Sequence, residues 1–452
     1  MFDHHGDGAN HMSLAVRLAW IRDQVGLIGI YAFSFYAWLG HGLARTGLAL
    51  IVLASLTDAR FWAMARRSVP VQVAGLTAAY IVARTVAAMI MTPELAAAHL
   101  AAGGYLLLMC AFVLVGWCMG GRERRILVAL MFALAGFTVG RIKNFDLSFD
   151  IPWWMQRPQF GLPTATAFGD YAAVAALGLL ILAPRLWRSV QGRAWKWLVM
   201  PIWFLAVLVF MQGVVLSQTR ATWFGLVVLL PVALMLYWRQ LISMSLARIV
   251  GSFLIFVTAT GLFMYMNYDT VSRRIGQDSE TYVQLLSGNF EDIEQSNSIG
   301  VFFFLHSAGL ETWRNNPVFG IGPFHTRVLS GAQVDGLGRS WNDFHNSYIE
   351  WLVQVGLVGT VLLLICIGSV FVAGWRAYRE RRIHLDVFAF LSLALALFLL
   401  ANFTSSRMLS KDGLLFWLFF GGALVTTSLA EGGAAQPHRL GDDTGNKSAS
   451  PV

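Results

Sequence analysis

A histidine, an asparagine and a carboxylate lie where a polar segment gives way to an apolar one, at His345, Asn346 and Glu350. A histidine with a pKa near its usual value of about 6.5 can accept a hydroxyl proton at physiological pH. If a helix begins here, Asn346 and Glu350 share a face, and Asn342 or Asp343 could cap it. The segment predicts a general base at the mouth of a membrane helix, although an interfacial histidine of this kind is also often structural.

Two arginines lie where a cation is unexpected. Arg220 follows Ser-Gln-Thr in a tight turn between two apolar runs. A guanidinium is planar, always charged and able to hold phosphate through two donors, so this turn is a candidate phosphate clamp, with an interfacial anchor as the alternative. Arg84 lies in the middle of an apolar run, where a charge is costly unless it faces a partner or a cavity. Helix packing and a polar, substrate-binding cavity both stay open for Arg84.

Two loops contain weaker candidates. Arg157 follows Trp153 and Trp154, and such tryptophans favour a membrane interface, although rings beside cations also suit sugars and lipid phosphates. Gly320 and Gly322 lie in a turn-rich stretch, where glycine lets the backbone approach a ligand or bend sharply. Plain turn geometry explains such a pair of glycines as well.

Membrane helices must position these side chains. The chain is 57% hydrophobic and 13% charged, whereas soluble domains carry about twice that share of charge. Apolar runs of about 17–25 residues recur, and each can cross about 30 Å of hydrocarbon as a helix that satisfies its own backbone. The sequence predicts an all-α polytopic membrane helical bundle with about twelve transmembrane helices, near 25–40, 45–57, 71–91, 103–119, 126–142, 165–183, 197–216, 220–238, 247–265, 347–374, 385–401 and 412–429.

Basic residues orient this bundle, because Lys and Arg concentrate in short cytoplasmic loops. The basic segments 120–125 and 375–382 fit a cytoplasmic N-terminus. The predicted organisation is a cytoplasmic segment at 1–24, nine transmembrane helices in 25–265, a large extracytoplasmic loop at 266–346 that carries His345, three more helices in 347–430, and a disordered cytoplasmic tail at 431–452.

Other classes of protein and site are disfavoured. The net charge of +8 reflects the asymmetry of the loops, and no basic stripe or RNA motif indicates a nucleic-acid partner. Cys110, Cys118 and Cys366 all fall within predicted spans, so we expect neither a disulfide nor thiolate chemistry. No metal site and no cofactor are predicted.

The residues around His345 resemble the signature of the bacterial O-antigen ligase and O-antigen polymerase superfamily. The resemblance covers Asn-Pro-Val-Phe-Gly-Ile-Gly-Pro-Phe at 316–324 and His-Asn-Ser-Tyr-Ile-Glu-Trp-Leu-Val-Gln-Val-Gly-Leu-Val-Gly at 345–359. The turn Ser-Gln-Thr-Arg-Ala-Thr-Trp at 217–223 is similar to that family's arginine turn, and residues 157–172 resemble a weaker version of its upstream segment.

The resemblance implies metal-independent glycosyl transfer at the periplasmic face of the bacterial inner membrane, by a protein of GT-C-type architecture whose 266–346 loop is periplasmic. The donor would be a glycan on undecaprenyl diphosphate, and the acceptor lipid A–core or a growing glycan, with membrane lipids and a chain-length regulator as further partners. His345 is cast as general base on the acceptor hydroxyl and Arg220 as a diphosphate-binding residue. The remaining substrate-binding candidates are Arg157, Asn346, Glu350, Gly320, Gly322 and Arg84.

One departure from the family pattern concerns a second arginine. Family members usually carry one upstream of the proline that corresponds to Pro317, whereas residues 298–306 of this chain contain none. Either Arg314, Arg327 or Arg339 serves the second phosphate charge, or this chain handles its substrate differently.

Three activities follow as alternatives. Within the superfamily, ligation of finished O-antigen to lipid A–core is slightly favoured over polymerisation of repeat units, because one arginine turn and one histidine loop on a twelve-span frame suit a ligase. A lipid-linked sugar transporter belongs to another class. It would show paired half-repeats and midplane polar sites, of which only Arg84 is an example, whereas a large asymmetric loop favours an inverting glycosyltransferase.

Overall fold

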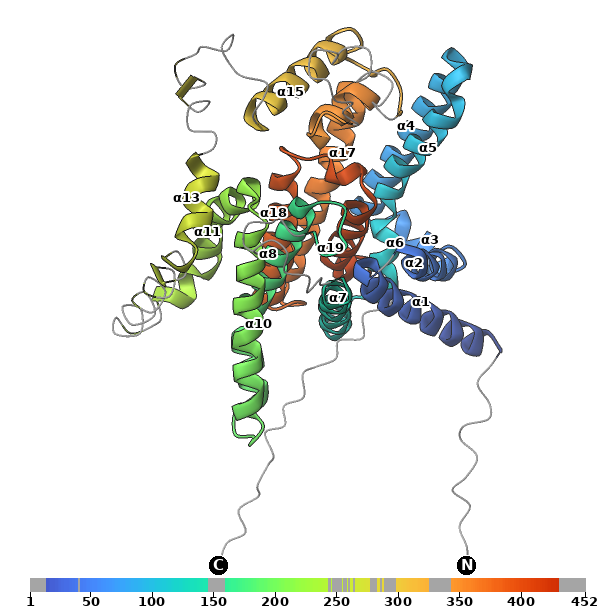
Figure 1. Cartoon of the computed structure of the whole chain (residues 1–452). Helices are drawn as coiled ribbons and strands as arrows, with labels where there is room; N and C mark the ends of the chain where they lie inside the picture. Colours follow the sequence, from blue (N-terminus) through green and yellow to red (C-terminus); the bar gives the residue numbers. More distant parts are fainter. Residues whose placement is uncertain are drawn as a thin grey trace, which may run out of the picture.

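A computed structural model describes residues 14–39, 41–144, 159–242, 265–276, 298–324 and 343–430, with isolated positions between 245 and 287. All regular elements in these ranges are helices. Figure 1 shows them gathered around α19, with α15 at one end of the molecule. The predicted site residue Arg157 and the candidate arginines Arg327 and Arg339 lie outside the described residues.

The helices follow one another through short connections. The first part of the chain contains α1 (Leu14–Leu39), α2 (His41–Leu56), α3 (Ala59–Ala65), α4 (Val69–Met91), η1 (Pro93–Leu95), α5 (Ala96–Leu108), η2 (Met109–Ala111), α6 (Phe112–Met119) and α7 (Glu123–Lys143). The second part contains α8 (Ala165–Ile181), α9 (Ala183–Val190), α10 (Lys196–Leu216), α11 (Arg220–Ile242), α13 (Tyr268–Gly276), α15 (Ser298–Arg314), α17 (Ser347–Arg379), α18 (Leu385–Ala401), η4 (Arg407–Leu409) and α19 (Lys411–Leu429).

The described residues include seven helices that are long and apolar enough to cross a membrane, or up to nine if each of two bent pairs is one span. The pairs are α2 with α3, bent by 76°, and α8 with α9, bent by 48°. A polytopic helical membrane protein is thereby confirmed, whereas the number twelve and the GT-C-type architecture stay predictions. The expected span 247–265 lies almost wholly outside the described residues, and 385–401 coincides with α18, a shorter apolar helix.

The helices divide sharply by burial. In its most apolar stretch α19 is 94% buried, whereas α11 is 17% buried. The exposed face of α11 is apolar, with Phe224, Val227 and Met235 as examples. A helix that is apolar all round and enclosed belongs to the core, and apolar side chains left outside such a bundle suit lipid. The core therefore lies around α19, which packs against α6, α17 and α18.

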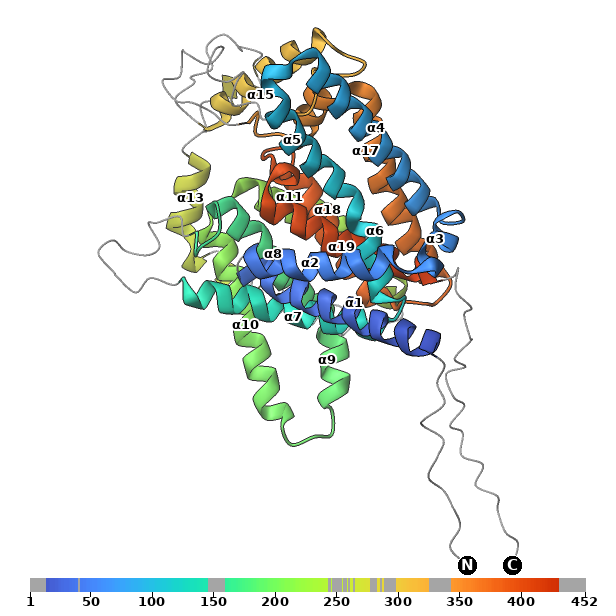
Figure 2. The same ribbon diagram turned by 90° about the vertical axis from the view of Figure 1, so that its right-hand side faces the viewer.

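Two sets of helices cross each other. In Figure 2, α1, α2 and α7 run across the view, while α4, α17 and α10 run steeply. α1 packs on both α2 and α7, and α4 packs along α17. α1 begins at Leu14, well before the predicted span 25–40, so part of the predicted cytoplasmic segment 1–24 is helical.

The predicted span 347–374 is interrupted. α17 is two helical stretches joined at Gly356, whose φ of 66° and ψ of −171° are not helical. Tyr80 on α4 donates a hydrogen bond to the Val355 carbonyl at 2.7 Å, which occupies one of the acceptors released by the break. The interruption matters for the site because the loop that precedes His345 in the chain docks against it.

Candidate functional site

His345 and Asp343 form the centre of the candidate site. Nδ1 of His345 lies 2.5 Å from Oδ1 of Asp343, and the backbone N–H of His345 donates to the same oxygen at 2.8 Å. Because an ionised carboxylate only accepts, Nδ1 carries the ring proton and Nε2 carries the lone pair. His345 adopts a positive φ of 52°, which is uncommon outside glycine and is held here by the carboxylate.

Both side chains of this pair remain partly accessible. The side chain of His345 is 30% exposed and that of Asp343 is 35% exposed. Burial lowers the pKa of His345, but the hydrogen bond and charge of Asp343 outweigh it and raise that pKa above its usual value. Burial correspondingly opposes, but does not prevent, a lowered pKa for Asp343. The pair is therefore a stabilised imidazole–carboxylate couple with one ring nitrogen free to accept a proton.

Asn346 and Glu350 hold the loop that presents the histidine. The side-chain oxygen of Asn346 caps α17 by accepting from the backbone N–H groups of Tyr348 at 2.9 Å and Ile349 at 3.2 Å. Glu350 is 1% exposed, and its Oε1 accepts from the backbone N–H of Phe344 at 2.7 Å. Both residues predicted to bind substrate thus also have positioning contacts on either side of His345.

The helix cap differs from the expected one. Asp343 was a predicted cap, but its carboxylate binds His345, and α17 begins one residue after Asn346. The physical reason is that the Asn346 side chain reaches the second and third N–H groups of the helix, as an N-cap must. Asn342, the other predicted cap, lies outside the described residues.

α15 forms one wall beside the histidine. The ring centroid of Phe302 lies 5.7 Å from that of His345, and His306 stacks on Phe302 at 6.3 Å. Burial lowers the pKa of His306, so this second imidazole is neutral near pH 7. The segment that lacks the family's arginine therefore brings an aromatic ring and a neutral histidine to the site.

The glycines of the 316–324 stretch approach the backbone of α17. Gly320 and Gly322 have φ values of 68° and 108°, in the region that favours glycine. The backbone N–H groups of Ile321 and Gly322 donate to the carbonyls of Val353 and Gln354 at 2.8 and 3.0 Å.

The same contact continues on the other side of the helix break. The N–H groups of Leu357 and Val358 donate to the carbonyls of Pro317 and Val318 at 2.9 and 3.2 Å. A Cβ at Gly320 would lie 2.6 Å from the backbone nitrogen of Gly356. The predicted close approach therefore exists, and the backbone approached is that of α17, whose broken ladder the loop satisfies.

Arg84 completes this junction from α4. Its Nε donates to the Phe319 carbonyl and its Nη2 to the Gly320 carbonyl, each at 2.9 Å. On α5 the ring of buried His99 contacts the Pro323 carbonyl through Nδ1 at 2.7 Å. Of the two interpretations left open for Arg84, these contacts fit helix packing, because its donors meet backbone oxygens of the neighbouring loop.

Arg220 is the first residue of α11, and its side chain is half-buried. The turn before it contains Gln218 at a positive φ of 51°, and Arg274 of α13 donates to the Gln218 carbonyl at 3.2 Å. A helix N-terminus favours negative charge, and so does a guanidinium. The position thus combines two features that attract a phosphate.

A path of polar side chains, not anticipated from sequence, links the two predicted catalytic positions. Ser406 donates to Asp343 at 3.2 Å, and the adjacent Arg407 lies 3.8 Å from Asp170. Asp170 accepts from Thr222 at 2.5 Å, two residues along α11 from Arg220. The histidine loop and the arginine turn are therefore braced on one buried structure.

The members of this path carried a signal that sequence reasoning passed over. Arg407 lies in a short polar turn between two apolar runs, which is the pattern that identified Arg220. Asp170 and Asp412 are carboxylates in or beside apolar runs, where an ionisable group requires a partner. Arg407 is that partner, at 3.0 Å from Asp412.

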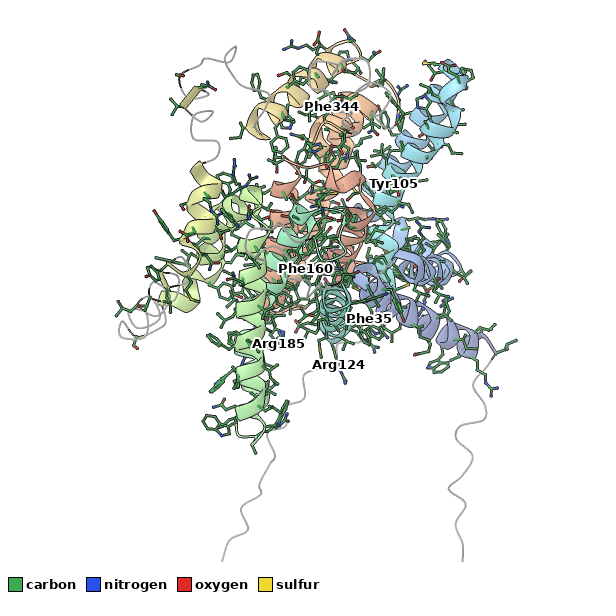
Figure 3. The ribbon with its side chains drawn as sticks, viewed as in Figure 1. Phe35, Tyr105, Arg124, Phe160, Arg185 and Phe344 are labelled. Atoms are coloured by element: carbon green, nitrogen blue, oxygen red, sulfur yellow. The ribbon has the colours of Figure 1, made fainter. Side chains whose placement is uncertain are left out.

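The arrangement can remove a proton from a hydroxyl that approaches Nε2 of His345, and it needs no bound ion to do so. Within the described ranges no three His, Cys, Asp or Glu side chains gather where they could hold a metal ion. Phe344 lies at the α15 end of the molecule, whereas Arg124 and Arg185 lie toward the opposite end (Figure 3). The candidate site thus occupies one end of the bundle.

Comparison with known proteins adds an independent finding. The sequence model of a family described as O-Antigen ligase matches residues 204–364, which include Arg220, the 316–324 stretch and His345. An uncharacterized protein of Haemophilus influenzae is 25% identical over 169 residues, or 36% of this chain. That match spans 41% of the relative's own length.

Proposed function

We propose, from the match of residues 204–364 to the O-antigen ligase family, that this protein ligates O-antigen to lipid A–core. The donor is a glycan on undecaprenyl diphosphate, and the acceptor is a sugar hydroxyl of the core. The observation that carries the proposal is the 2.5 Å contact between His345 and Asp343 at the start of α17. It supports a general base inside the matched segment.

The proposed reaction is one displacement. The acceptor hydroxyl gives its proton to Nε2 of His345 while its oxygen attacks the anomeric carbon of the donor. The bond from that carbon to the diphosphate oxygen breaks, and the lipid diphosphate leaves with the electron pair. A single base suffices and no protein nucleophile takes part, so the configuration at the anomeric carbon inverts.

Arg220 is proposed to bind the diphosphate. Negative charge grows on the leaving group as the glycosidic bond breaks, and donors placed where charge develops lower the barrier. The position at the start of α11 supports this role, because the helix N-terminus and the guanidinium act on the same side of the turn. Arg157 and the NH₂ group of Asn346 are proposed to contact the saccharide.

The reaction is proposed to occur at the periplasmic face of the bacterial inner membrane. The basic segments 120–125 and 375–382 support a cytoplasmic location for the end of the bundle opposite His345. Cysteine labelling in the 266–346 loop tests this orientation. Labelling of that loop only from the cytoplasm would contradict the catalytic proposal, since the lipid-linked glycan would then be on the wrong side.

The activity is tested by lipopolysaccharide gels of a deletion strain complemented with wild type or His345→Ala. A ligase defect gives bare core, with long glycan retained on the lipid carrier. Core capped by a single repeat would instead identify a polymerase. A wild-type ladder from His345→Ala would remove His345 from the mechanism, and a gel that never changes would contradict a role in this glycan.

A further inference from the structure

A second polar cavity lies at the end of the bundle opposite His345, where α1, α3, α6 and α7 meet. Its volume is about 250 Å³. Figure 3 labels Arg124 at this end, and Arg122 and Arg125 on either side of it line the cavity. The charged residues of the lining are Arg22, Asp23, Asp58, Arg60, Arg122 and Arg125.

The two carboxylates of this cavity are already engaged. Asp58, whose side chain is 2% exposed, lies 3.2 Å from Nη2 of Arg22 and 3.0 Å from Nη2 of Arg60. Asp23 lies 2.8 Å from the same Nη2 of Arg60. Trp117 also donates to Asp58 at 3.3 Å. Two of the four arginines are therefore fixed in place by two acids, and the cavity keeps a surplus of two positive charges.

Arg122 and Arg125 supply that surplus. They stand three residues apart at the start of α7 and therefore point to one side of it. Among the described residues neither has a carboxylate within ion-pair distance. The turn before them uses Gly120 at a φ of 63°, and a Cβ there would lie 2.7 Å from Nη1 of Arg125. Glycine thus leaves room for the Arg125 guanidinium to lie in the cavity.

We propose that this cavity binds the phosphate headgroup of an anionic membrane lipid. Arginine holds phosphate through paired donors, and two unneutralised guanidinium groups match the charge of a phosphate. Basic pockets between membrane helices on the cytoplasmic side are suited to such headgroups. This inference does not depend on the proposed transfer reaction, whose residues lie at the other end of the molecule.

The neighbouring surface favours a lipid over free phosphate as the source of the anion. Trp62, two residues from Arg60, is 53% exposed, and Trp20, two residues from Arg22, is 60% exposed. Tryptophan is enriched where the hydrocarbon meets the headgroups. The cavity therefore lies beside side chains that belong at the depth of lipid phosphates.

The test is native mass spectrometry of the full-length protein released from nanodiscs that contain phosphatidylglycerol and phosphatidylcholine. Wild type should retain phosphatidylglycerol selectively. Arg122→Gln and the double variant Arg122→Gln/Arg125→Gln should retain about tenfold less phosphatidylglycerol for each charged hydrogen-bond donor that is removed. Arg124→Gln is the matched control, because it removes the same charge from an exposed neighbour that does not line the cavity.

Each outcome decides the proposal. Equal retention in all variants, or no preference of wild type for phosphatidylglycerol, would overturn it. Binding of inorganic phosphate without lipid selectivity would identify a soluble phosphate site and overturn the lipid assignment. Arg122 is exposed, so its single variant should keep the wild-type elution volume and give an answer even if the double variant misfolds.

Discussion

Oδ1 of Asp343 contacts His345 twice, through the backbone N–H at 2.8 Å and through Nδ1 at 2.5 Å. One carboxylate oxygen thereby sets both the unusual backbone conformation of His345 and the orientation of its ring. A carboxylate that orients an imidazole and stabilises its protonated form is a recurrent device of general-base catalysis. Asp343 is consequently a positioning residue, and its effect is expected in the pH profile as well as in the rate.

Replacement of His345 by alanine should lower the rate of glycan transfer about 10²–10⁴-fold, the usual contribution of a general base. The rate is measured with purified protein in nanodiscs and lipid-linked donor. His384→Ala is the control, because this exposed histidine pairs with Glu123 at 2.9 Å and lies outside the proposed site. Equal decreases in the two variants would contradict a specific role for His345.

The pH dependence of kcat/KM should follow the His345–Asp343 pair. The base must be neutral, and the pKa of His345 is raised, so activity is present above that pKa and is lost as pH falls through it. In Asp343→Asn the hydrogen bond and charge that raise the pKa disappear. The acid limb should then move to lower pH while the maximal rate also falls, since an amide can hold the wrong tautomer.

The control for this profile is Asp269→Asn, which neutralises an exposed carboxylate on α13. Its acid limb should match wild type. An unchanged limb in Asp343→Asn would show that the titration observed in kcat/KM does not belong to the pair.

Arg220→Ala should reduce kcat/KM for the lipid-linked donor about 10–100-fold, the effect of removing a hydrogen bond to a charged group. Arg220→Lys should fall between wild type and alanine, because lysine keeps the charge but not the planar pair of donors. Arg188→Ala, at an exposed position on α9, serves as the control. Turnover of Arg220→Ala near the wild-type rate would exclude diphosphate binding by this residue.

Gly356→Ala should destabilise the protein strongly. The residue has a positive φ of 66°, which costs a non-glycine residue about 1–3 kcal/mol, and its Cβ would collide with the carbonyl oxygen of Val318. Gly368→Ala in the same helix meets nothing within 4 Å and should be neutral or slightly stabilising. Thermal unfolding of the two purified variants measures the difference, and similar Tm values would contradict the observed junction.

Arg84→Met should lower thermal stability while the donor KM stays unchanged. The substitution removes the two 2.9 Å hydrogen bonds to Phe319 and Gly320, each worth about 1.5–3 kcal/mol when the donor is charged. Arg45→Met, at an exposed position on α2, is the comparison. A raised donor KM at unchanged Tm would favour substrate binding by Arg84 over the packing role.

Local pattern was sufficient for several features of this protein. Run length and hydropathy predicted the helical membrane class, and the tight polar turn predicted that Arg220 stands at the mouth of a helix. The change from polar to apolar sequence located the start of α17 just after His345. These features depend on neighbouring residues, since a membrane helix satisfies its own backbone and its ends are set by nearby caps.

The partners of the site residues were decided by tertiary structure alone. Arg84 meets Phe319 across 235 positions of sequence, and Arg407 meets Thr164 across 243. The interruption of α17 at Gly356 likewise becomes favourable only when the 316–324 loop supplies hydrogen bonds to it. The sequence by itself determined which residues could do chemistry and on which helix ends they lie. Which of them orient the base and which brace the fold depended on distant groups, because a buried polar group must find its partner wherever the packing places one.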